Sequence, residues 1–109
     1  MVQVPRMGYA EAFGGVVHQA SRAGSAVRYT FTGHSVAWIA ERGPGYGKAR
    51  VYIDGALAST VDLGQATPAS RQFVFRKAWP SMGTHTIRIV VEGTVGRAPV
   101  NLDGFAVLR

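Results

Sequence analysis

The stretch GKARVYIDG, residues 47–55, decides the fold, because its apolar and polar residues alternate and an Asp-Gly pair ends it. Ala49, Val51 and Ile53 fall on one side of an extended chain, which is the pattern of a half-buried strand. Asp54-Gly55 supplies two residues that tolerate positive φ, as a two-residue type I′ turn requires. The stretch therefore predicts a β-hairpin whose second strand covers residues 56–63.

The same alternation recurs along most of the chain, and no stretch keeps a helical spacing of apolar residues over three turns. Strands are predicted at residues 16–21, 25–32, 35–41, 48–53, 56–63, 71–79, 84–91 and 100–108. Gly33-His34 and residues 80–83 are expected to form tight turns between neighbouring strands. The predicted fold is all-β, an antiparallel β-sandwich built as a jelly roll of about eight strands.

The alternation also predicts which side chains face the core, and His85, inside an apolar strand, is expected to be buried or half-buried. The inward residues expected from the pattern are Val27, Tyr29, Phe31, Val36, Trp38, Ala40, Ala49, Val51, Ile53, Leu57, Val61, Leu63, Phe73, Phe75, Trp79, Val100, Leu102, Ala106 and Leu108.

Length and composition indicate one globular domain over residues 1–109. The chain has 47% hydrophobic and 17% charged residues and no cysteine, which excludes cysteine nucleophiles and thiolate metal sites. No apolar run approaches the roughly 20 residues that span a bilayer, so membrane insertion is not expected. Pro5, Arg6 and Glu11 interrupt any signal-peptide core, so if the domain is exported, its signal is expected to lie elsewhere or to have been removed.

The net charge of +6 favours acidic partners, but the basic residues do not cluster, so no specific nucleic-acid binding is predicted. The loop RGPGYGK, residues 42–48, lacks the glycine and the Ser or Thr that a phosphate-binding loop needs. It is interpreted either as a flexible hairpin loop with Tyr46 at its tip or as a loop that contacts a ligand. His18, His34 and His85 lack zinc-site spacing, and no nucleophile-elbow pattern occurs, so the chain is not predicted to be an enzyme.

Tyr52 alternates with Val51 and Ile53 and is therefore expected to face outward, beside Arg50 and Asp54. An aromatic ring for the C–H face of a sugar, next to charged groups for its hydroxyls, is a combination typical of glycan sites. The alternative is an ordinary solvent-facing tyrosine. Asp103 lies within the last predicted strand, where it is expected to bind calcium, to pair with an arginine or to be solvated.

Several segments together resemble the galactose-binding-like jelly-roll modules that are appended to secreted bacterial glycosidases, peptidases and surface proteins. The resemblance covers residues 14–109 and rests on YTFTG at 29–33, VAWIA at 36–40, GKARVYIDG at 47–55, GTHTIRI at 83–89 and VNLDGF at 100–105. It implies a sandwich fold and a non-catalytic carbohydrate-binding module that binds a glycan or polysaccharide and anchors an attached enzyme or surface protein. The implied location is extracellular or at the cell surface, as part of a larger protein.

The resemblance also implies site residues. Related modules often hold a structural calcium through an acidic residue of the last strand and another near the first, which correspond here to Asp103 and Glu11. Sugar contacts in such modules come from loops at one edge, here those with Tyr46, His18 or Arg97, or from the concave face. The alternative function is a structural or protein-interaction domain, used for adhesion, decoration or spacing, that self-associates or packs on a partner protein.

Overall fold

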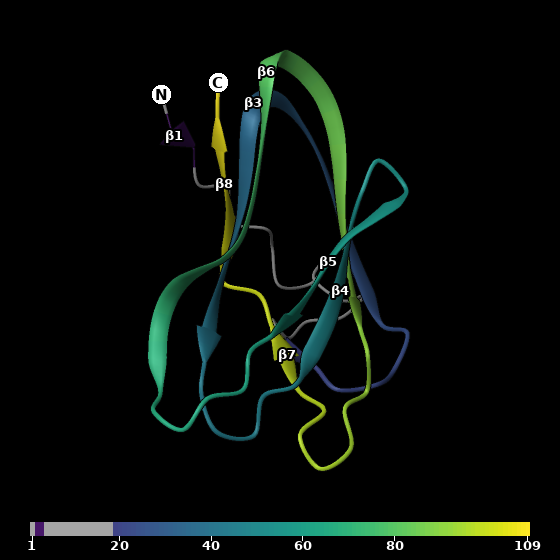
Figure 1. Ribbon diagram of the computed structural model, residues 1–109, viewed down its shortest axis with the longest axis vertical. Helices are drawn as coiled ribbons and strands as arrows, with labels where there is room; N and C mark the ends of the chain where they lie inside the picture. The colour runs from purple at the N-terminus through teal and green to yellow at the C-terminus, as the bar shows by residue number, and fades with distance from the viewer. Residues whose placement is uncertain (1, 4–18) are drawn as a thin grey trace.

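The computed structural model describes residues 2–3 and 19–109, and in that part the chain folds into strands joined by turns and loops (Figure 1). The strands are β1 (Val2–Gln3), β2 (Gln19–Ala20), β3 (Ala26–Arg42), β4 (Lys48–Ile53), β5 (Ala56–Asp62), β6 (Ala69–Val91), β7 (Val100–Asn101) and β8 (Gly104–Leu108). A six-stranded antiparallel sheet has the order β1-β8-β3-β6-β4-β5, and β2 pairs with β7. No helix long and apolar enough to cross a membrane occurs in the described ranges.

The long strands β3 and β6 pair along their whole length and pass from one layer of the sandwich to the other. Gly33 pairs with Gly83 but Ser35 pairs with Ala78, so the four residues 79–82 of β6 lie opposite the single residue 34 of β3. This irregularity bends both strands into the arch at the top of Figure 1. One layer contains residues 26–33 and 83–91 with β4 and β5; the other contains residues 35–42 and 69–78 with β8 and β1.

The core lies between the two layers, and the most deeply buried large side chains include Trp38, Phe105, Leu63, Ile87 and Ile89. The alternation of apolar residues in β3 and β4 predicted their inward faces correctly: Val27, Phe31, Val36, Trp38, Ala40, Ala49, Val51 and Ile53 are all buried. The hairpin is confirmed, because Ile53 pairs with Ala56 and the turn residues Asp54 and Gly55 have φ angles of 51° and 86°. The all-β jelly-roll sandwich is therefore the observed fold.

The predicted turns at Gly33-His34 and at residues 80–83 are wrong, because these residues lie within β3 and β6. Turn-forming residues mark the place where each strand bends between layers, not a reversal of the chain. Glycine is needed at position 33, since a Cβ there would lie 2.7 Å from the carbonyl oxygen of Leu108 and 2.7 Å from Cγ1 of Val107. The predicted strand at 100–108 is likewise divided into β7 and β8.

Three predicted core residues are exposed: Leu57 by 58%, Phe73 by 54% and Leu108 by 42%. Each lies next to a break in the ladder, across which the side chains change face. A register shift opposite Trp38 and Ile39 leaves Val74 as the extra residue, so Val74 is buried and Phe73 faces outward. A similar shift opposite Val51 and Tyr52 turns Leu57 outward, and the break between β7 and β8 does the same for Leu108.

Candidate functional site

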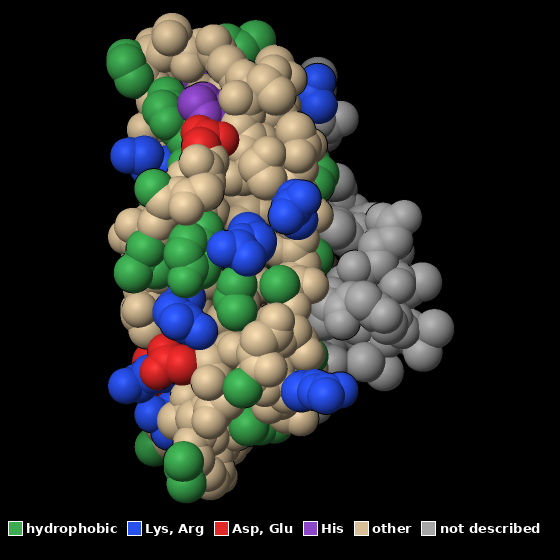
Figure 2. All heavy atoms as spheres, turned by 90° about the vertical axis from the view of Figure 1, so that its right-hand side faces the viewer, with side chains coloured by type: hydrophobic (Ala, Val, Ile, Leu, Met, Phe, Trp, Pro, Cys, Tyr) green, Lys and Arg blue, Asp and Glu red, His purple; other side chains and the backbone are tan. Residues whose placement is uncertain are grey.

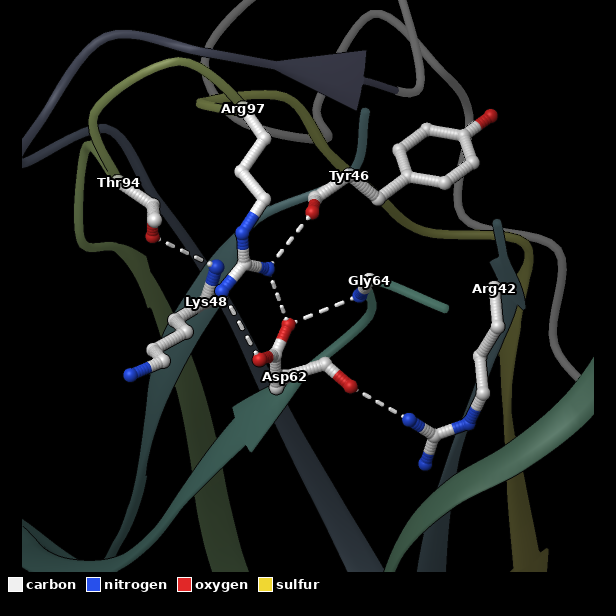
Figure 3. Close-up of polar contacts among 7 residues, drawn as sticks. All are labelled: Arg42, Tyr46, Lys48, Asp62, Gly64, Thr94 and Arg97. Carbon is white, nitrogen blue, oxygen red and sulfur yellow. Dashed lines mark hydrogen bonds and ion pairs between the residues drawn. The ribbon is translucent and has the colours of Figure 1, made fainter. Parts of the chain in front are cut away.

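At one end of the sandwich, three loops meet at an ion pair between Asp62 and Arg97 (Figure 3). Arg97 Nη1 lies 2.5 Å from Asp62 Oδ1 and Nη2 lies 3.1 Å from Oδ2, and Nη1 also donates a hydrogen bond to the carbonyl oxygen of Tyr46. The backbone N–H of Gly64 donates to Asp62 Oδ1. Hydrogen bonds from Arg97 and Gly64 hold the pKa of Asp62 below its ordinary value. We call these residues, with the carbonyl oxygen of Tyr46, the loop cluster.

Tyr46 does not stand at an open loop tip. Its ring is half-buried against the core, and its hydroxyl donates a hydrogen bond to Glu41 Oε1 at 2.5 Å. The hydrogen bond to Glu41, and then burial, raise the pKa of Tyr46. In Figure 3 the Tyr46 side chain points away from the Asp62–Arg97 pair. Tyr46 and Arg97, predicted as ligand contacts, are thus neighbours in the structure, but the polar groups of both already bond other parts of the chain.

A second group of polar residues lies on the outer face of the layer that contains β4 and β5. Three outward positions of neighbouring strands form a row, because Arg28 of β3 pairs with Arg88 of β6, and Arg88 pairs with Tyr52 of β4. In the next row Thr30 pairs with Thr86, and their hydroxyl oxygens are 2.9 Å apart. We use the name basic face for the set Arg28, Thr30, Arg50, Tyr52, Asp54, Thr86 and Arg88. Figure 2 shows Lys and Arg side chains spread over one side of the molecule, with acidic and hydrophobic side chains between them.

Tyr52 and Arg50 lie on this face, on alternate residues of β4, and both are half-buried. The guanidinium carbon of Arg88 lies 4.5 Å from the centre of the Tyr52 ring, a cation–π arrangement. Nε of Arg50 is buried and has no hydrogen-bond partner among the residues that the structure describes. The basic face thus brings together the predicted Tyr52 and Arg50 with Arg88.

A hollow of about 570 Å³ opens beside this row, lined by Arg28, Thr30, Asp54, Gly55, Thr86 and Arg88. Asp54 lies at the hairpin turn, where its Oδ2 accepts a hydrogen bond from His85 Nδ1 at 2.6 Å and its Oδ1 accepts one from the N–H of Thr86 at 2.9 Å. These hydrogen bonds lower the pKa of Asp54, so the carboxylate is an ionised acceptor at neutral pH. His85 is half-buried, as predicted, and stacks on Trp79 with ring centres 3.7 Å apart.

Sequence reasoning missed Arg28, Arg88, Thr30 and Thr86 as members of a site. Their outward orientation follows from the alternation, but their proximity depends on which strands are neighbours. The sequence does not indicate the register in which two segments about 60 residues apart in the chain pair, and this register brings the four residues together.

Of the two predicted calcium ligands, the structure describes Asp103 alone. Glu11 lies outside the described residues, as does the predicted glycan contact His18. Asp103 is half-buried in the bend between β7 and β8, where its backbone N–H donates to the carbonyl oxygen of Ile39. Within the described ranges, no three His, Cys, Asp or Glu side chains cluster. Calcium takes six to eight oxygen ligands, so a calcium site at Asp103 would need further oxygen donors.

A third feature is an apolar groove of about 370 Å³ on the other layer, between β8, β3 and β6. Its lining includes the exposed side chains of Phe73 and Leu108, with Arg76 and Lys77. The guanidinium carbon of Arg76 lies 4.9 Å from the centre of the Phe73 ring. The bulge at Val74 therefore creates an exposed aromatic side chain on the layer opposite the basic face.

No family model matches the chain. It is 36% identical over 81 residues to an A type blood alpha-D-galactosamine galactosaminidase from Flavonifractor plautii, which covers 74% of this chain and 7% of that protein. It is 33% identical over 92 residues to an A type blood N-acetyl-alpha-D-galactosamine deacetylase from the same organism, which covers 84% of this chain and 11% of that protein. The matched region is thus a small part of each relative.

Solved structures agree with the fold over nearly the whole chain. The CBM36-1 domain of a multidomain xylanase from the hindgut metagenome of Trinervitermes trinervoides matches 95% of this chain and 83% of its own, with a TM-score of 0.56 at 16% identity. A CBM36 carbohydrate-binding module in complex with calcium and xylotriose matches 95% of this chain and 86% of its own, with a TM-score of 0.53 at 13% identity. A family two carbohydrate esterase from Cellvibrio japonicus matches 98% of this chain and 34% of its own, with a TM-score of 0.63 at 14% identity. The chain is therefore a jelly-roll β-sandwich with the fold of carbohydrate-binding modules, as the resemblance in its sequence predicted.

Proposed function

We propose that this chain is a non-catalytic carbohydrate-binding module and that its basic face holds the glycan. The observation that carries the proposal is the hollow of about 570 Å³ beside Tyr52 and Arg88, in which hydroxyl, carboxylate and guanidinium groups line one concave surface. A sugar ring presents an apolar C–H face and a rim of hydroxyls, so it needs this mixture of an aromatic edge and polar groups. The fold shared with carbohydrate-binding modules supports the same role.

The chemistry of the hollow supports binding in preference to hydrolysis. Its one carboxylate, Asp54, is kept ionised by hydrogen bonds from His85 and Thr86, so it accepts hydrogen bonds and does not serve as an acid at neutral pH. The sugar hydroxyls are the natural donors to that carboxylate. The threonine hydroxyls and the two guanidinium groups then bind the remaining oxygens.

The proposed role includes attachment to a larger protein that acts at or outside the cell surface. The chain spans 7% and 11% of the two curated relatives, whose names describe a galactosaminidase and a deacetylase of galactosamine-containing sugars. A small binding domain within a long carbohydrate-active protein keeps the attached enzyme close to its substrate, which raises the effective concentration.

The test is a glycan and polysaccharide screen with the 109-residue chain, followed by titration of any glycan that binds. Tyr52→Ala is expected to weaken binding about tenfold, because it removes the aromatic edge of the site. The matched control is Phe73→Ala, which removes an exposed aromatic ring from the opposite layer. The absence of glycan binding, or equal losses in both variants, would count against this site.

The other predicted site residues are proposed to add to the binding at the basic face. Tyr46, Arg97 and His18 are proposed as loop contacts for a longer glycan, and Asp103 with Glu11 as a structural calcium site. Calorimetric titration with calcium tests the latter: saturable binding that Asp103→Asn abolishes supports the site, and no binding overturns it. The CBM36 neighbour in complex with calcium supports testing this ion first.

A second candidate function is self-association or contact with a partner protein. The observation that favours it is the apolar groove, where Phe73 and Leu108 are exposed. Exposed large apolar side chains that line one depression are typical of protein contact surfaces. The molar mass in solution across a wide concentration range tests it: a dimer that Phe73→Ala dissociates supports self-association, and a monomer throughout counts against it.

A further inference from the structure

The basic face carries positive charge that its own strands do not neutralise. Arg28 and Arg88 occupy directly opposite positions on antiparallel neighbours, and Arg50 lies on the same face one strand away. Like charges directly opposite each other on a sheet destabilise it. Because the repulsion between Arg28 and Arg88 lowers the stability of the folded protein, we expect an interaction with negative charge that offsets it.

The described part of the protein does not supply that compensation. The two ion pairs found there are Asp62–Arg97, in the loop cluster, and Asp54–His85. Asp54 is the one carboxylate that lines the hollow, and its ion-pair partner is His85, not Arg28 or Arg88. Arg28 and Arg88 thus line the hollow without a described acidic partner.

The geometry points to a glycan that carries a carboxylate or sulfate group, with this group bound between Arg28 and Arg88. Guanidinium groups bind carboxylate and sulfate oxygens through paired N–H donors, which gives direction as well as attraction. The hydroxyls of Thr30 and Thr86 and the Asp54 carboxylate then face the neutral hydroxyls of the same sugar. This inference rests on the proposed function and adds the substrate class of the same site.

A glycan fits these observations better than a nucleic acid does. A nucleic-acid surface tracks a row of phosphates with a row of basic side chains. Here two arginines lie in one hollow whose rim also carries the anionic Asp54, which would repel a neighbouring phosphate. The site is therefore suited to one anionic group surrounded by hydroxyls.

The experiment compares matched probes by calorimetry with the full chain at about 0.15 M salt, where non-specific attraction is partly screened. The probes are oligogalacturonide and its methyl ester, a sulfated galactan oligosaccharide and its desulfated form, and a short DNA duplex. We expect a charged probe to bind at least about tenfold more tightly than its neutral partner. Arg28→Gln and Arg88→Gln are expected to remove this preference, whereas Arg76→Gln, on the other layer, keeps it. The melting temperature of each variant establishes that it is folded.

The outcomes separate this inference from the proposed function. Equal binding of charged and neutral glycans that Tyr52→Ala weakens would overturn the anionic preference and leave carbohydrate binding intact. No glycan binding at all would overturn both. DNA binding as tight as glycan binding, with equal losses in Arg28→Gln and Arg76→Gln, would show non-specific charge attraction and would also overturn the inference.

Discussion

Arginine has two different roles in the loop cluster and on the basic face. In the loop cluster, Arg97 bonds both carboxylate oxygens of Asp62 and a backbone carbonyl, so its charge is neutralised within the protein. On the basic face, Arg28 and Arg88 lie side by side, and neither forms an ion pair with a carboxylate of the described residues. The comparison shows that residue type alone does not identify a binding residue. It also matters whether the hydrogen-bonding groups of the side chain are already bonded to other parts of the protein.

The region around the loop cluster should be the more sensitive to changes in packing, and Gly47, the residue after Tyr46, is closely approached there by the backbone of Arg97. A Cβ at Gly47 would overlap the carbonyl oxygen of Arg97 and lie 3.2 Å from Cβ of Thr94. The carbonyl belongs to the backbone and cannot rotate away. Gly47→Ala is therefore expected to lower the free energy of unfolding by about 2 kcal/mol, as measured by urea denaturation.

The control for that substitution is Gly43→Ala in the same loop. A Cβ at Gly43 would make only ordinary contacts, 3.5 Å from Pro68 and 3.6 Å from the ring of Tyr46. A loss in Gly43→Ala as large as in Gly47→Ala would show that the loop is sensitive to any side chain and that the close approach of Arg97 is not the reason.

Exchanging arginine for glutamine in each region should separate stability from binding. Arg97→Gln is expected to lower the melting temperature, because Asp62 loses its two hydrogen bonds from Arg97, and to leave binding of a short glycan, which reaches only the basic face, close to that of the wild type. Arg88→Gln is expected to weaken binding and to change stability by less than about 0.5 kcal/mol, because relief of repulsion offsets the lost contact with Tyr52. Thermal melts and calorimetry of the same two variants measure both. The reverse pattern would contradict the assigned roles.

The smallest expected effect is a pH dependence of stability. The pKa of Asp62 is lower in the folded chain than its ordinary value of 3.8, so its interactions stabilise the fold above 3.8 and are lost as pH falls through the lower folded value. Denaturation across this acidic range should show a fall in the free energy of unfolding that is less steep in Asp62→Asn. Since Asp54 has a pKa lowered in the same direction, Asp54→Asn serves as the comparison at the basic face.

The fold was predictable from the sequence wherever the alternation of side chains ran without interruption. In β4 and in the first half of β3, the apolar positions are buried as expected, and Asp54-Gly55 forms the predicted hairpin turn. The predictions failed at the bulges. Phe73 and Leu57 change face because an extra residue enters one strand of a pair, and this depends on the partner strand as much as on the residue itself.

The candidate site was predictable only in part. Tyr52 and Arg50 were identified because outward orientation is a local property of one strand. Arg28 and Arg88 were missed because they are 60 positions apart and meet through long-range pairing of β3 with β6. Arg97 was identified as a ligand contact, but its bonds to Asp62 could not be foreseen, since they join two separate loops.

The sequence by itself determined that the chain forms strands in which apolar and polar residues alternate, so that one face of each strand is apolar. It also determined that a hairpin turns at Asp54-Gly55. These properties depend on backbone preference and on the period of two along an extended chain, which act between near neighbours. Only the tertiary structure decided where β3 and β6 bend between the layers, which side chains the bulges turn outward, and which arginines are paired or left available. Those outcomes depend on the register between segments far apart in the chain, because a shift of one residue reverses the face of every side chain that follows.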